Sequence, residues 1–300
     1  MRDFRWPPPP DGGPRTYGPG PSGPRTGRPV LPEPETELIA TPHGVRLEQL
    51  VTGAGDPVTV FAHGFAHGIA TTRPLGSAVA GRKVFFQFRG HGRSDAPPGP
   101  WDYHDLARDL RTVADLAGAR QAVGMSLGAG ALARLLADSP DRFDKAIFFL
   151  PNVLDQPRPA SVQHRIAELV AALGEGDVSS IAEAIAAETP VQVRNTPAAW
   201  SYLRTRIDQL LRDGLAPELA DLADAVAVPD PQELRAVTAR CLVIGCAGDD
   251  LHPVEVARRL AAALPTAQLH LYDRPGVLWN HRTDLRQRVS EFLNSPAAVT

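Results

Sequence analysis

The chain has 300 residues, enough for one large domain or two small ones. Hydrophobic residues make up 43% of it, and its formal net charge is −3. This composition allows a sizeable core and argues against a nucleic-acid or anionic-membrane surface. The sequence has no apolar run of about 18 residues, and MRDFRWPPPP lacks the apolar region of a secretion signal. We therefore expect a cytoplasmic protein.

The two cysteines agree with that compartment. Cys241 and Cys246 lie five residues apart in and just after one predicted strand, too far apart for a disulfide. Two cysteines are also too few for a metal framework. We expect two buried thiols and no metal or organic cofactor.

Residues 1–34 are rich in proline and glycine, and their apolar residues show no period. Such a segment cannot bury enough surface to offset its ordering entropy, so we predict a disordered tail with local polyproline II around Pro7–Pro10. A solvated tail is the simpler interpretation. Weak docking to a proline-binding module is the alternative.

A series of short β-rich runs begins after the tail. They are VRLEQLV (45–51), PVTVFAH (57–63), KVFFQF (83–88), KAIFFL (145–150), CLVIGC (241–246) and QLHLYD (268–273). A further strand-like run covers residues 119–123. Helical patterns separate the later runs, which predicts an α/β fold with a doubly wound, mostly parallel sheet. The first two runs follow each other without a helix, so we expect antiparallel pairing at that edge.

Helices are predicted from apolar residues at i, i+4 and i+7. One helix carries Leu106, Leu110 and Val113; another carries Leu285, Val289 and Phe292 after an N-cap at Thr283. Residues 156–236 hold further helical patterns and no strand pattern. We therefore predict an α/β core of residues 35–155 and 237–300, with a helical cap inserted at 156–236 over the strand ends.

The pentapeptide Gly124-Met125-Ser126-Leu127-Gly128 follows the run at 119–123 and opens a helical pattern. A G-x-S-x-G sequence at a strand-to-helix turn exposes a serine hydroxyl, and its glycines relieve crowding there. The helix N-terminus would direct its amides at a forming anion. Ser126 is therefore the candidate nucleophile, and a helix-start residue is the simpler alternative.

A serine nucleophile needs a base, and the base needs an orienting acid. Asp249 and Asp250 follow the strand CLVIGC, and His281 lies in the loop after the strand QLHLYD. This order matches that of the hydrolases. His281 is preferred as the base over the other histidines of this region, because His252 lies only three residues from Asp249 and His270 lies inside a strand.

An oxyanion donor is also required, and the segment His63-Gly64-Phe65 follows the strand PVTVFA. We expect its Phe65 amide to lie beside the Leu127 amide and to hold the oxyanion with it. The spacing of His63 and His67 suggests a metal pair, but Gly64 and the loop context argue against a helical metal site. His67 could instead line the pocket, and His91 is expected to be structural.

The segments HGF (63–65), FRGHGRSD (88–95), GMSLGA (124–129) and GDDLHP (248–253), with the late His281, resemble the α/β-hydrolase fold superfamily, over roughly residues 37–295. The resemblance implies a structural role for His63 and for the RGHGRS segment. It also implies that Asp249 is the acid, because relatives commonly carry the acid four residues before a proline, here Pro253. Relatives often place glycine before the catalytic histidine, whereas Asn280 precedes His281 here.

The sequence thus predicts a serine hydrolase of a carboxylic ester or lactone, with a Ser126–His281–Asp249 triad acting on a small-molecule substrate. One alternative is a non-hydrolytic ligand-binding or receptor protein on the same fold, since a fold does not fix a function. A C–C hydrolase or acyltransferase that uses the same triad is the other. The sequence specifies neither the substrate nor the oligomeric state.

Overall fold

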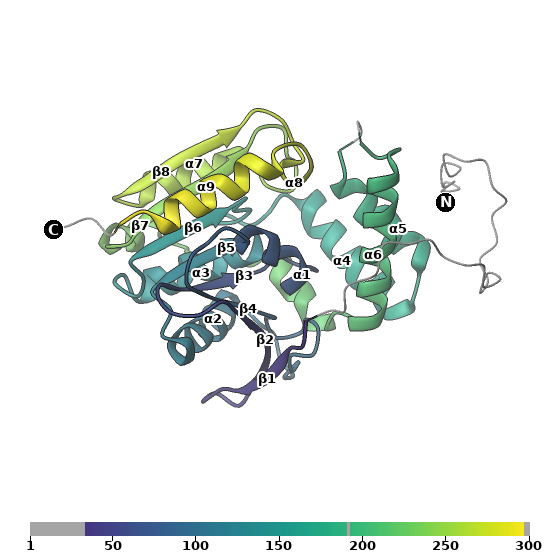
Figure 1. Ribbon diagram of the computed structural model, residues 1–300. Helices are drawn as coiled ribbons and strands as arrows, with labels where there is room; N and C mark the ends of the chain where they lie inside the picture. Colours follow the sequence, from purple (N-terminus) through teal and green to yellow (C-terminus); the bar gives the residue numbers. More distant parts are fainter. Residues whose placement is uncertain (1–33, 191–192, 297–300) are drawn as a thin grey trace.

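A mostly parallel sheet forms the centre of the structure, a computed structural model that describes residues 34–190 and 193–296 (Figure 1). Its strands are β1 (Glu37–Ala40), β2 (Arg46–Thr52), β3 (Val58–Ala62), β4 (Arg82–Phe86), β5 (Gln121–Met125), β6 (Lys145–Phe149), β7 (Arg240–Cys246) and β8 (Ala267–Tyr272). Their order is β1-β2-β4-β3-β5-β6-β7-β8. The predicted tail lies outside the described residues apart from Pro34.

The predicted antiparallel edge is confirmed, but the first two predicted strands, β2 and β3, do not pair with each other. β2 pairs antiparallel with β1 and β4, while β3 lies on the far side of β4 and pairs parallel with it. β3, β5, β6 and β7 are parallel neighbours. The loops after these strands therefore meet at one edge of the sheet, where ligands bind in open α/β sheets.

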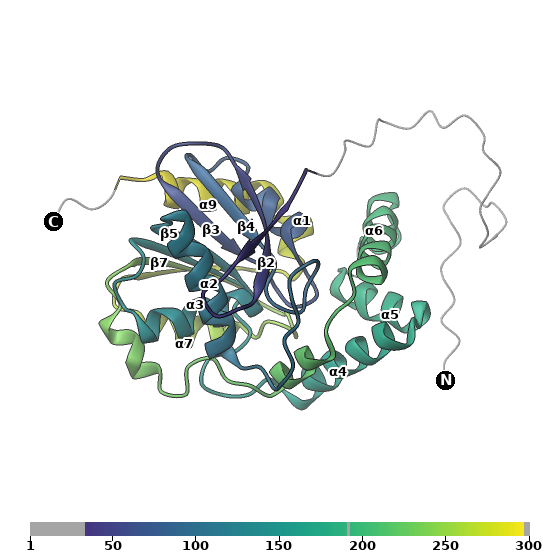
Figure 2. The same cartoon turned by 90° about the horizontal axis from the view of Figure 1, so that it is seen from below.

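Helices cover both faces of the sheet. They are α1 (Ile69–Thr72), α2 (Tyr103–Ala117), α3 (Leu127–Asp138), α4 (Ala160–Glu175), α5 (Val178–Glu188), α6 (Pro197–Asp213), α7 (Val254–Ala263), α8 (Val277–Asn280) and α9 (Arg282–Asn294), with 3-10 turns η1 (Arg73–Gly76), η2 (Pro217–Ala223) and η3 (Pro231–Ala236). α2, α3 and α7 pack on one face, and α1 and α9 on the other (Figure 2). None of the described helices is long and apolar enough to cross a bilayer.

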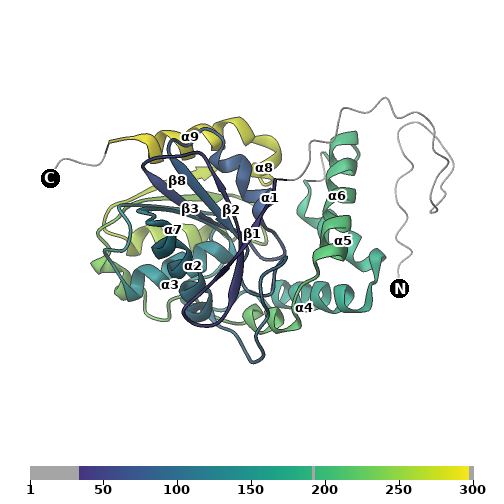
Figure 3. The same cartoon turned by 60° about the horizontal axis from the view of Figure 1, so that its bottom comes forward.

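The interval between β6 and β7 divides into two parts. α4, α5 and α6 lie to one side of the sheet in Figures 1 and 3 and share a small apolar cluster that includes Ile181, Leu203 and Ile207. η2 and η3 instead pack on the main core through Leu219 and Leu234. We use "cap" below for α4–α6. Cys241 and Cys246 are buried free thiols, as predicted.

Candidate active site

Ser126 lies at the sharp turn between β5 and α3. Its backbone adopts φ 50° and ψ −106°, a strained conformation for a residue other than glycine. Its amide donates to Phe149 O at 2.9 Å, which fixes the turn to the neighbouring strand β6. Strain held in place by surrounding bonds is typical of a functional turn and presents the hydroxyl beyond the strand end.

The glycines on either side of Ser126 are required by close backbone contacts. A Cβ at Gly124 would lie 2.4 Å from Gly128 O, and one at Gly128 would lie 2.5 Å from Ala62 O. Gly128 N also donates to His63 O at 3.0 Å. The G-x-S-x-G pattern thus lets the start of α3 pack directly on β5 and on the loop after β3.

His252 is the histidine that lies beside Ser126. Its Nε2 lies 3.1 Å from Ser126 Oγ, and its Nδ1 lies 3.0 Å from Asp249 Oδ2. Because a carboxylate can only accept, Nδ1 carries the proton and Nε2 is free to accept from the hydroxyl. This is the hydrogen-bond order of a nucleophile, a base and an orienting acid.

The loop after β7 brings Asp249 and His252 together within one turn. Asp249 Oδ1 accepts from the amides of Leu251 and His252 at 3.0 and 3.2 Å. Burial alone would raise the pKa of Asp249, but the hydrogen bond and charge of His252, with these two amides, lower it below its ordinary value. Asp249 therefore stays ionised at neutral pH. Asp250 is exposed to solvent, so the geometry favours Asp249.

The structure does not bring His281, the predicted base, to Ser126. The short helix α8 carries His281 away to the junction with α9, where its ring stacks on Tyr272 with centroids 4.6 Å apart. Its Nε2 is 3.7 Å from Asp273 Oδ1 and has no hydrogen-bond partner in the described chain. His252, only three residues from Asp249, occupies that position instead.

The loop after β3 lies against Ser126, as an oxyanion loop must. A Cβ at Gly64 would be 3.3 Å from Ser126 Cβ, so only glycine allows this approach without a shift. Among the described residues, no protein acceptor is found for the amides of Phe65 and Leu127. Amides without a protein acceptor are available to donate to an oxyanion that develops beside them.

Three histidines, two of them fully buried and His67 partly so, support this loop. His63 Nδ1 donates to Gly64 O at 2.8 Å, and His67 Nδ1 donates to Phe65 O at 2.8 Å. His91 Nδ1 donates to Arg89 O at 3.1 Å, and its Nε2 accepts from the Ala66 amide at 3.3 Å. These bonds assign His63 and His91 to structural roles, as predicted, and His67 also binds the backbone.

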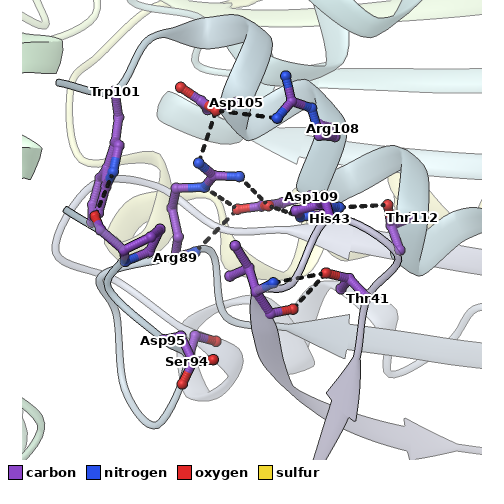
Figure 4. A network of polar contacts seen from close by, with 12 residues as sticks. Thr41, His43, Arg89, Ser94, Asp95, Trp101, Asp105, Arg108, Asp109 and Thr112 are labelled. Carbon is purple, nitrogen blue, oxygen red and sulfur yellow. Dashed lines mark hydrogen bonds and ion pairs between the residues drawn. The ribbon is translucent and has the colours of Figure 1, made fainter. Parts of the chain in front are cut away.

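A buried ion-pair network holds the segment that carries His91 (Figure 4). Arg89 is 4% exposed and donates to both carboxylate oxygens of Asp109 and to Asp105 on α2. His43 approaches Asp109 from the other side, at 3.0 Å. Bidentate pairing of this kind fixes orientation as well as charge, so His91 is held rigidly under Ala66.

Burial lowers the pKa of all three histidines: that of His67 to about 3, that of His91 to about 4, and that of His63 well below its ordinary value. In the unfolded chain they would titrate near pH 6.5. Between these pH values the unfolded state binds more protons, so stability falls as the pH is lowered below about 6.5.

We therefore expect the free energy of unfolding, measured with urea, to be smaller at pH 5.5 than at pH 7.5. Each ring lowers the free energy of unfolding by up to about 1.4 kcal/mol per pH unit below pH 6.5. The carboxylates with lowered pKa values, such as Asp249, lose their contribution only below about pH 4 and cannot cause this change. Equal stability at the two pH values would contradict the assignment of neutral, buried histidines.

Comparisons with known proteins identify the family to which this doubly wound sheet belongs. The sequence profile of the Alpha/beta hydrolase family matches residues 59–289. A putative carbamate hydrolase, RutD, of Caulobacter segnis is 29% identical over 227 residues, covering 71% of this chain and 82% of that protein. A homoserine O-acetyltransferase of Deinococcus radiodurans is 27% identical over 220 residues, covering 66% and 65%.

Solved structures agree on the fold. The enol-lactonase from Burkholderia xenovorans superposes with a TM-score of 0.73 at 19% identity, covering 86% of this chain and 100% of that one. The chain therefore belongs to the alpha/beta hydrolase family, and it is an enzyme of the hydrolase type.

Proposed function

We propose that the protein is a serine hydrolase of carboxylic esters or lactones, with Ser126 as nucleophile, His252 as base and Asp249 as the acid that orients it. The observation that carries the proposal is the 3.1 Å distance between Ser126 Oγ and His252 Nε2. Esters fit because an alkoxide leaving group needs one proton, which the protonated His252 can return.

The reaction would run in two steps. His252 accepts the Ser126 proton as Oγ attacks the carbonyl, and the amides of Phe65 and Leu127 donate to the oxyanion. His252 then protonates the leaving alcohol, which yields an acyl-enzyme on Ser126. Water, deprotonated by His252, attacks that acyl group and releases the acid. The homoserine O-acetyltransferase relative supports a second candidate, in which an alcohol replaces this water.

The test combines a fluorophosphonate probe with p-nitrophenyl esters of increasing acyl length. We expect labelling of Ser126, located by peptide mass spectrometry, and turnover of at least one ester. Repeating turnover with an added alcohol, and analysing products, separates transfer from hydrolysis. Folded protein that shows neither labelling nor turnover would refute the proposal and favour a ligand-binding protein on this fold.

The two neighbouring aspartates give a matched pair of variants. Asp249→Asn leaves the shape but cannot hold His252 in the tautomer with Nδ1 protonated, so we expect kcat to fall about 10⁴-fold. Asp250→Asn removes an exposed charge and should change kcat by less than about twofold. Steady-state kinetics on one ester measures both. Equal effects of the two substitutions would argue against Asp249 as the orienting acid.

A further inference from the structure

A buried cation of the cap contacts the oxyanion loop. Arg206, on α6, is 4% exposed, and its Nη2 donates to the carbonyl oxygen of Ala66. Ala66 is itself buried and belongs to the apolar cluster of the cap. The side chain therefore joins the cap to the loop that follows β3, at a point two residues from Gly64.

Two hydrogen-bonded peptide groups connect the Arg206 contact to the Phe65 amide, the proposed oxyanion donor. The Ala66 carbonyl shares its peptide group with the His67 amide, and that amide donates to Gly64 O at 3.0 Å. The Gly64 carbonyl in turn shares its peptide group with the Phe65 amide. A carbonyl that accepts a hydrogen bond polarises its peptide group, which makes the N–H of the same group a stronger donor. The positive charge of Arg206 thus acts on the Phe65 N–H through this series of hydrogen-bonded peptide groups.

Other contacts of the loop keep these hydrogen bonds aligned. Ala66 has φ 55°, a left-handed conformation that costs energy for alanine. The bonds of Arg206 to its carbonyl and of His91 to its amide hold it there. His63 also donates to Gly64 O, but its lowered pKa leaves it neutral. Arg206 therefore supplies the formal charge to this chain of bonds.

We propose that Arg206 is a positioning residue for the oxyanion hole: it holds the loop and polarises the Phe65 amide through the Ala66 and Gly64 carbonyls. The inference rests on the proposed function. The cap then contributes to the stabilisation of the transition state through α6. Substrate binding in the ground state needs little of this polarisation, since a neutral carbonyl carries less charge than an oxyanion.

The test compares Arg206→Gln with Arg204→Gln, which removes the same charge from an exposed position on the same helix. Losing one oxyanion donor altogether costs about 10²- to 10³-fold in rate, so weakening one should cost less. For a p-nitrophenyl ester we expect R206Q to lower kcat about 10-fold with KM nearly unchanged. We expect R206K to retain more activity than R206Q, and R204Q to match the wild type.

A trifluoromethyl ketone gives the readout that a merely structural role would not change. It forms a hemiketal on Ser126, and ¹³C NMR measures the pKa of the hemiketal oxygen. We expect that pKa to rise in R206Q and to stay unchanged in R204Q. If R206Q does not fold, R206A with and without low guanidinium replaces it. A kcat that rises with guanidinium supports the proposal, and no rise contradicts it.

The outcomes separate the two proposals. A wild type that turns over esters and forms the hemiketal, with an R206Q variant that equals it in kcat and hemiketal pKa, would overturn the role of Arg206 alone. A wild type that neither hydrolyses esters nor binds the ketone would refute the proposed function, and the role of Arg206 with it.

Discussion

Replacing Ser126 with alanine is expected to lower kcat for p-nitrophenyl esters by about 10⁶-fold and to abolish labelling by a fluorophosphonate. The reason is that Ser126 Oγ is the atom that would attack the carbonyl, and no step of the acyl-enzyme route proceeds without it. Steady-state kinetics and mass spectrometry measure the two effects.

Ser201→Ala is the matched control, because Ser201 is exposed on α6. It should keep full activity and full labelling. Within residues 34–190 and 193–296 the Ser126 hydroxyl hydrogen-bonds only to His252, so the S126A protein should fold normally. Activity that survives in a folded S126A protein would show that the chemistry takes place elsewhere.

The substitution His252→Gln is expected to lower kcat by about 10⁵- to 10⁶-fold, since glutamine cannot accept the Ser126 proton. His281→Gln should lower it by less than about threefold, because that ring stacks on Tyr272 and does not hydrogen-bond to Ser126. The pair distinguishes the two candidate bases directly. A large loss in H281Q with little change in H252Q would mean that the loop after β8 carries the base after all.

Much of the sheet could be predicted because most of its strands are short β-rich runs separated by helical patterns. β1 was missed: its four residues pair only with β2 and carry a mixed, half-exposed pattern. The N-cap of α9 is His281 and not Thr283, because α8 ends just before it. η2 and η3 fall within the predicted cap range but pack on the main core. Helical periodicity shows which face of a helix is buried, but not which part of the protein that face contacts.

The positions of the proposed nucleophile and acid could be predicted because they follow from strand ends, which sequence patterns locate well. The position of the proposed base could not, because the order of motifs favours a histidine after β8. Spacing alone made His252 seem too close to Asp249. In the structure the Asp249 carboxylate accepts two amides of the same turn, which folds His252 back over it. The signal was present in GDDLHP, as a histidine immediately before the proline at which α7 begins.

The most direct measurement of the central claim is a crystal structure of the enzyme after reaction with a fluorophosphonate. We predict a phosphorus bonded to Ser126 Oγ, a phosphonyl oxygen within about 3 Å of the Phe65 and Leu127 amides, and the His252 ring beside the adduct. A phosphonyl oxygen directed away from both amides, or the His281 ring in place of His252, would contradict the account.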